Sequence, residues 1–94
     1  MRLEIVMTLY LKNPRAALDY RIDWGGRRDV ARVDWTVNPD EPGGLTVLDA
    51  GIDATTVRAT LDGGRAGQAY RVTGEVLFED GRRASRSIGL QVGR

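Results

Sequence analysis

Three aspartates come closest to a catalytic or metal-binding arrangement in this sequence. Asp19 and Asp23 lie four positions apart within one segment of alternating polarity, and Asp34 lies within the next such segment. Carboxylates that lie close together can bind Ca²⁺ or act as an acid and base pair. Arg21 and Arg32 alternate with the aspartates, however, and opposite charges on neighbouring strands are natural cross-strand partners. We therefore interpret this group as the solvent-exposed face of a sheet.

The sequence contains no histidine and no cysteine. The commonest general base is therefore missing, together with the ligands that transition metals prefer. Without cysteine, the chain also forms no disulfide bond. We predict that the protein is not an enzyme and that it carries neither a cofactor nor a stoichiometric metal.

Residues 63–67, Gly-Gly-Arg-Ala-Gly, have the composition of a phosphate-binding loop. Such a loop normally leads into a helix, whose N-terminus holds the anion. Here it leads from one alternating segment into another, and we interpret it as a β-turn.

The charges of the chain are balanced and dispersed, with fourteen basic and thirteen acidic residues and a net charge of +1. Nucleic-acid-binding proteins usually cluster their basic charge, and no apolar run approaches the roughly 20 residues of a membrane span. We therefore expect neither nucleic acid nor a membrane as a partner. The densest basic cluster is Arg82, Arg83 and Arg86. It adjoins Glu79 and Asp80, as is typical of a solvated hairpin tip, and the rim of a protein contact is the second interpretation.

Strands must position these side chains, because apolar residues recur at every second position along most of the chain. The predicted strands cover residues 18–24, 31–37, 45–48, 55–61, 69–79 and 82–92. Asp80-Gly81 is a strong hairpin signal, because such turns need residues that tolerate a positive φ. Residues 49–54 are predicted to form a turn.

About seven short strands with frequent turn signals predict a single domain, over residues 1–94, with the fold of an immunoglobulin-like antiparallel β-sandwich. A small β-barrel is the alternative. Trp35 has the position of the core tryptophan in the third strand of such a sandwich. Tyr70 has the position of a tyrosine corner, in which the hydroxyl bonds to backbone upstream. Both side chains are expected to be buried.

Residues 1–12 form either a first strand or an N-terminal arm. Leu9 and Leu11 share one face of the alternating segment 3–11, and Tyr10 lies off that face. The segment can fold back onto its own sandwich or pair with the sheet edge of a neighbour. For an isolated chain we expect it to fold back, because closing a short loop costs little entropy. In an assembly, Leu9, Tyr10 and Leu11 are the expected centre of a partner surface.

The loop tips are further candidates for the partner contact. Arg27 and Arg28 lie in the polar loop after residue 24, and Arg82 and Arg83 lie at the predicted hairpin. The loop at residues 42–44 is a third candidate.

Six motifs in a fixed order give the chain a resemblance to a known family. They are Leu-Tyr-Leu-Lys-Asn-Pro (9–14), Leu-Asp-Tyr-Arg-Ile-Asp-Trp (18–24), Trp-Thr-Val (35–37), Gly-Leu-Thr-Val (44–47), Gly-Gly-Arg-Ala-Gly-Gln-Ala-Tyr-Arg-Val-Thr (63–73) and Asp-Gly-Arg-Arg-Ala-Ser-Arg-Ser-Ile (80–88). In this order they resemble small proteins of tailed-phage and prophage structural gene clusters, labelled fiber-tail adaptor proteins. The chain departs from that family after Trp24, where the family often has a longer loop.

The resemblance implies a non-enzymatic structural adaptor that joins virion components by protein–protein contacts. Its expected partners are other head, tail or fiber proteins, and a second copy of the chain in the particle. No signal-peptide cleavage site precedes residues 12–14, so we expect synthesis in the host cytoplasm and a final location in the virion. The alternatives are a capsid decoration protein and a free-standing β-sandwich that binds peptide or carbohydrate.

Overall fold

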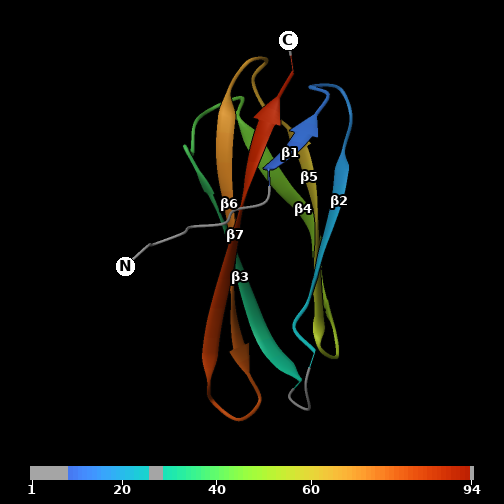
Figure 1. The fold of residues 1–94 in the computed structure, drawn as a ribbon, viewed down its shortest axis with the longest axis vertical. Helices are drawn as coiled ribbons and strands as arrows, with labels where there is room; N and C mark the ends of the chain where they lie inside the picture. Colours follow the sequence, from blue (N-terminus) through green and yellow to red (C-terminus); the bar gives the residue numbers. More distant parts are fainter. Residues whose placement is uncertain (1–8, 26–28, 94) are drawn as a thin grey trace, which may run out of the picture.

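The computed structural model describes residues 9–25 and 29–93. Over these residues the chain forms seven β-strands and no helix, and the strands form two sheets packed face to face (Figure 1). In chain order the strands are β1 (Leu9–Lys12), β2 (Leu18–Asp23), β3 (Val30–Asn38), β4 (Leu45–Asp53), β5 (Thr56–Gly63), β6 (Ala69–Phe78) and β7 (Arg83–Val92). This part of the chain therefore contains no helix long and apolar enough to cross a membrane.

The strand order is β1-β7-β6-β3 in one sheet and β2-β5-β4 in the other. Neighbouring strands are antiparallel, except that β1 runs parallel to β7. Placing β3, β6 and β7 against β2, β5 and β4 is the arrangement of an immunoglobulin-like sandwich, and the predicted fold is confirmed. The β-barrel alternative is wrong, because the two sheets stay separate instead of closing into one.

The core lies between the two sheets, where alternation directs every second side chain of a strand. The largest fully buried side chains are those of Ile22, Leu61, Ile88, Leu90, Val57, Val72, Val76 and Val92. Burying one such side chain contributes about 1.5–3 kcal/mol. The alternation predicted for residues 55–61, 69–79 and 82–92 is confirmed in β5, β6 and β7, and these strands contribute most of a core that contains no disulfide bond.

Tyr70 forms the predicted tyrosine corner at the start of β6. Its side chain is only 3% exposed. Its hydroxyl accepts a hydrogen bond from the backbone N–H of Arg65 at 2.9 Å and donates one to Glu41 Oε1 at 3.0 Å. One buried hydroxyl therefore ties together the loops that precede β4 and β6.

Trp35 lies on the inward face of β3, as predicted, but it is only partly buried. Its ring covers Gly74 of β6, where an added Cβ would lie 3.0 Å from the ring, and it meets Tyr20 edge to face at 6.0 Å. β3 is an edge strand, and the ring borders an open groove that Val37 and Val47 also line. Trp35 therefore points towards the core, as predicted, but it is less buried than predicted, because the sandwich is open on this side.

Two bulges change the expected strand pattern. In β3 the register shifts between Val30 and Arg32, so that Val30 is buried and Ala31 is exposed. In β4 the register shifts between Leu48 and Gly51, and the strand continues to Asp53. The prediction of a turn over residues 49–54 is therefore wrong, because a bulge absorbs the irregularity within the strand.

The two predicted turns, one between β5 and β6 and one between β6 and β7, are confirmed. At the β6–β7 hairpin the N–H of Gly81, with φ of 90°, donates to the carbonyl of Phe78 at 2.9 Å, and the N–H of Phe78 donates to the carbonyl of Arg82 at 2.8 Å. Residues 64–68 connect β5 to β6 as a loop, with no helix following. The glycines at 63–67 therefore make a turn and no helix-based anion site.

Candidate partner-binding surfaces

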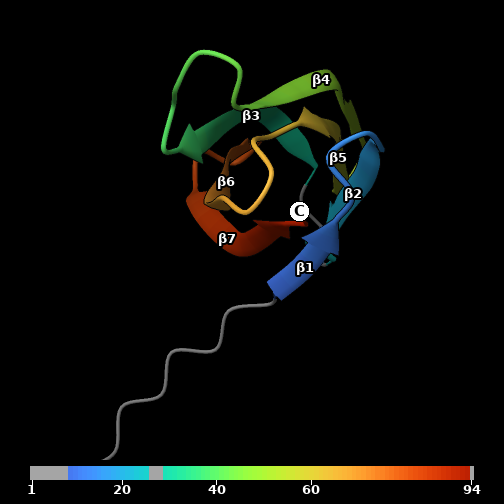
Figure 2. The ribbon, with the colours of Figure 1, turned by 90° about the horizontal axis from the view of Figure 1, so that it is seen from above.

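Strand β1 lies at the edge of its sheet, beside β7 and near the start of β2 (Figure 2). Its side chains alternate between core and solvent. Tyr10 and Lys12 point inward, whereas Leu9 and Leu11 point outward and are 64% and 79% exposed. Leu9–Lys12 pair with β7 of the same chain, which is the folded-back arrangement expected for an isolated chain. The remainder of that segment, residues 1–8, lies outside the described residues.

Tyr10 supports β1 from the inside. Its ring meets Tyr20 edge to face at 5.7 Å and packs against the core. Burial raises the pKa of Tyr20, and the neighbouring Tyr10 contributes to the same shift. Of the three residues expected at the partner surface, the structure thus directs Leu9 and Leu11 outward and places Tyr10 behind them.

Lys12, the only lysine in the chain, is 4% exposed. Its ammonium donates to the carbonyl of Asn13 at 2.9 Å and to that of Gly63 at 2.7 Å. Burial lowers the pKa of Lys12, and the nearby Asp62 carboxylate opposes this shift. Gly63 ends β5 of the opposite sheet, so this side chain fastens β1 to both layers. This role of Lys12 was not predicted from the sequence. The only signal was that Lys12 shares the side of the strand with Tyr10, opposite Leu9 and Leu11.

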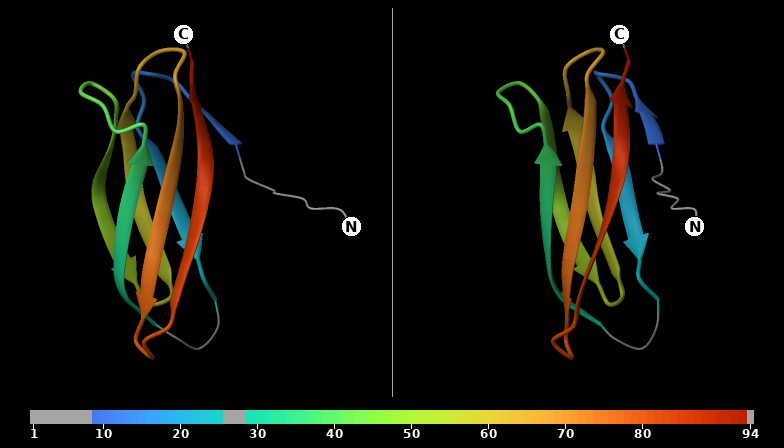
Figure 3. Two further views of the ribbon diagram at one scale, coloured as in Figure 1. Left: turned by 90° about the vertical axis from the view of Figure 1, so that its left-hand side faces the viewer. Right: turned by 60° about the vertical axis from the view of Figure 1, so that its left-hand side comes forward.

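Arg82 and Arg83, which were also predicted as contact residues, lie far from Leu9 and Leu11. Arg82 and Arg83 are at the β6–β7 hairpin, whereas β1 accompanies the last residues of β7, at the opposite end of the sandwich (Figure 3). Arg82 lies 3.9 Å from Asp80, and both side chains are exposed. Arg27 and Arg28 lie outside the described residues. The structure therefore does not bring Arg82 and Arg83 into one surface with Leu9 and Leu11.

The aspartates that could have formed a site do not cluster. Asp19 and Asp23 lie on the outer face of β2, and Asp34 lies on β3 in the other sheet. Within residues 9–25 and 29–93, no group of three or more potential ligands is placed to hold a metal ion. The exposed sheet face is confirmed. The expectation that Arg21 pairs across strands with an aspartate is wrong, because Arg21 lies directly opposite Arg58 of β5.

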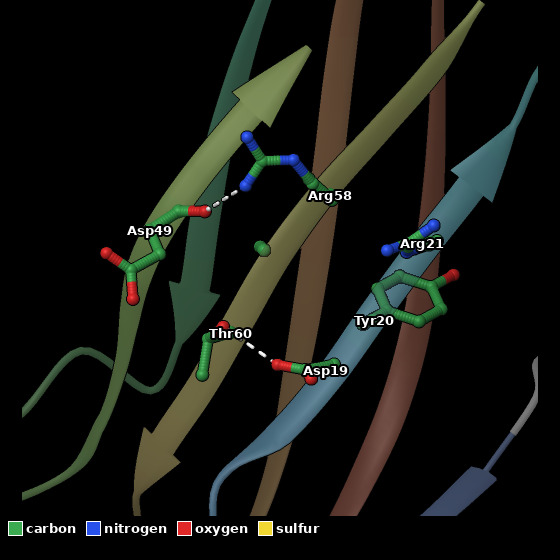
Figure 4. A pocket seen from close by; sticks show the side chains of 7 residues that line it. Asp19, Tyr20, Arg21, Asp49, Arg58 and Thr60 are labelled. Carbon is green, nitrogen blue, oxygen red and sulfur yellow. Dashed lines mark hydrogen bonds between the residues drawn. The ribbon is translucent and has the colours of Figure 1, made fainter. Parts of the chain in front are cut away.

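A small hollow of about 130 Å³ lies beside this arginine pair, on the outer face of β2-β5-β4 (Figure 4). Arg58 Nη1 donates to the backbone carbonyl of Asp49 at 3.2 Å, and Thr60 donates to Asp19 at 2.9 Å. The guanidinium of Arg58 lies over Gly51, where an added Cβ would come within 2.6 Å of Cζ. Small-molecule sites usually measure about 300–1,000 Å³, so the hollow suits a single side chain better than a substrate.

Comparison with known proteins identifies a family. The family described as podophage GP4 fiber-tail adaptor protein gp77 matches residues 12–91, which include β2 to β6 and nearly all of β7. No curated protein matches the chain.

Proposed function

The chain belongs to the podophage GP4 fiber-tail adaptor protein gp77 family, and on this basis we propose that it is a non-enzymatic adaptor within a tailed-phage or prophage-derived particle. It joins two virion components, in the fiber and tail or in the head–tail region, by protein–protein contacts. It is made in the host cytoplasm and resides in the virion.

The outward side of β1 is the observation that supports this proposal most directly. Among the large apolar side chains that the structure describes, Leu9 and Leu11 are the most exposed, at 64% and 79%. Adjacent apolar side chains in water often mark a contact surface. β1 also ends its sheet, so its free backbone edge can pair with a strand of a partner. Side-chain burial and strand pairing can therefore act together at one place.

The support behind β1 suits a contact that forms without rearrangement. Lys12 bonds to the end of β5, Tyr10 packs on Tyr20, and the Gly93 N–H donates to the Lys12 carbonyl at 2.8 Å. A strand already ordered in the free protein loses less conformational entropy on binding. A domain this small offers limited contact area, and repetition around a symmetric particle adds avidity.

We expect the double variant Leu9→Ser/Leu11→Ser to fold normally and to lose binding to its virion partner. Burying two leucines is worth a few kcal/mol, so affinity falls by at least about tenfold. The assay is a pull-down, followed by titration, against purified tail and fiber proteins of the same phage. The matched control is Leu48→Ser, which changes a 44% exposed leucine on β4 of the other sheet.

If Leu9→Ser/Leu11→Ser binds as tightly as the wild type, β1 is not the contact surface. Arg82 and Arg83 at the hairpin then become the next candidates, and charge reversal at both positions tests them.

A further inference from the structure

Two arginines occupy directly opposed positions on neighbouring strands of one sheet. Arg21 of β2 and Arg58 of β5 are directly opposite in the antiparallel register, and both side chains are on the exposed face. Like charges at directly opposed positions destabilise a sheet. Neither arginine has an ion pair with any residue in the described part of the chain. Within the described residues, Arg58 therefore has only a hydrogen bond to the backbone carbonyl of Asp49, and no carboxylate forms an ion pair with either arginine.

The other sheet carries the opposite arrangement. Asp34 of β3 and Glu75 of β6 are directly opposed in register, again on the exposed face. Arg32 Nε lies 3.5 Å from Asp34 Oδ2, and Arg83 Nη1 lies 3.5 Å from Glu75 Oε1. All four side chains are more than half exposed, and ion pairs of this kind contribute about 0–1 kcal/mol.

The residues around each pair extend the complementarity. Asp19 and Asp23 flank Arg21 along the outer face of β2, so the arginine pair has acidic neighbours. Arg32 and Arg83 flank the acidic pair, so it has basic neighbours. One outer face of the sandwich therefore carries the inverse charge pattern of the other.

We infer that copies of this chain stack front to back, with the Arg21–Arg58 pair of one copy seated on the Asp34–Glu75 pair of the next. The contact relieves the like-charge repulsion in both sheets at once. The hollow beside Arg58 has room for a carboxylate side chain. This inference does not depend on which virion component the adaptor binds.

Such an interface uses a different surface on each of the two copies. Each added copy again presents a free face, so the assembly closes into a ring or continues as a filament, according to the rotation between copies. β7 and β6 separate β1 from β3 in the sheet. A copy seated over β3 and β6 therefore leaves Leu9 and Leu11 open to another partner. Because the contact is electrostatic and exposed, salt weakens it.

The test uses charge reversal in the full chain, with sedimentation velocity as the readout across protein concentrations. The wild type is expected to associate at low salt and to dissociate at about 1 M salt, where the Debye length is about 3 Å. Arg21→Glu/Arg58→Glu sets an acidic pair against the Asp34–Glu75 pair, and Asp34→Arg/Glu75→Arg sets a basic pair against the Arg21–Arg58 pair. Each variant alone is expected to associate at least about tenfold more weakly than the wild type.

Restoration separates this interface from a general effect of charge. An equimolar mixture of the two variants again pairs acidic faces with basic ones, and so does a single chain that carries all four changes. Both are expected to recover association to the wild-type level. The control is Arg15→Glu/Arg82→Glu, which makes the same change in net charge as Arg21→Glu/Arg58→Glu but in two loops away from the paired faces. It is expected to associate as the wild type does.

Three results would overturn the inference. They are a wild type that stays monomeric at low salt and high concentration, a reversed variant that associates as the wild type does, and a four-change chain that folds but stays monomeric. Thermal unfolding of every variant shows that the chains compared are folded.

Discussion

The buried ammonium of Lys12 links the fold to the surface that the fold presents. It satisfies a carbonyl at the end of β5 and, through its own backbone, holds β1 against β7. Burial lowers its pKa below the ordinary value of 10.5. The unfolded chain therefore still binds the Lys12 proton at a pH where the folded chain has begun to release it. Stability consequently rises with pH between the lowered folded-state pKa and 10.5.

We expect Lys12→Met to destabilise the domain by about 1–3 kcal/mol near neutral pH, because the carbonyl of Gly63 loses its hydrogen-bond donor. The difference from the wild type should widen as pH rises towards 10.5, since only the wild type gains stability from release of this proton. Chemical denaturation of both proteins over the alkaline range measures both effects. A difference that stays constant with pH would mean that the pKa of Lys12 is not lowered.

The sequence allowed Tyr70 to be predicted but not Lys12. The hydroxyl of Tyr70 bonds to backbone only five residues upstream, within a recurrent local motif. Lys12 bonds to a carbonyl that is 51 residues away in the sequence. The alternation of residues 3–11 separates an inner from an outer side, and it does not say which polar side chain will find a partner inside.

At the scale of elements, alternation predicted where strands run but not how they are interrupted. The inward faces of β5, β6 and β7 follow from period two alone. The bulge in β4 does not, because an inserted residue shifts parity without changing composition. The parallel direction of β1 was not predictable either, since alternation does not encode the neighbouring strand.

Gly64 in the β5–β6 loop has both a positive φ and a close neighbour, so replacing it tests how much each restricts a side chain. Gly64 and Gly25 have φ of 94° and 62°, where side chains are disfavoured. An added Cβ at Gly64 would lie 2.8 Å from Val92 Cγ2, whereas at Gly25 nothing lies within 4 Å. Gly64→Ala is therefore expected to destabilise by about 1–3 kcal/mol, and Gly25→Ala by less. Thermal unfolding compares the two. Equal losses would mean that the contact with Val92 adds nothing to the cost.

At the scale of the whole molecule, the number and spacing of strands predicted the sandwich, and the pairing register decided its surfaces. That Arg21 faces Arg58, and Asp34 faces Glu75, depends on which residues lie opposite each other. The sequence therefore predicted an exposed charged face without its arrangement. The structure shows the exposed leucines of β1 and, on the two outer faces, an opposed arginine pair and an opposed acidic pair.

The central claim is that this chain is an adaptor whose β1 strand contacts another virion protein. A cryo-EM reconstruction of the purified particle, at a resolution that resolves strands, tests it most directly. We predict density for the sandwich between two other components, with Leu9 and Leu11 buried against a protein of different sequence. A particle that lacks the chain, or one in which β1 faces only solvent, would contradict the claim.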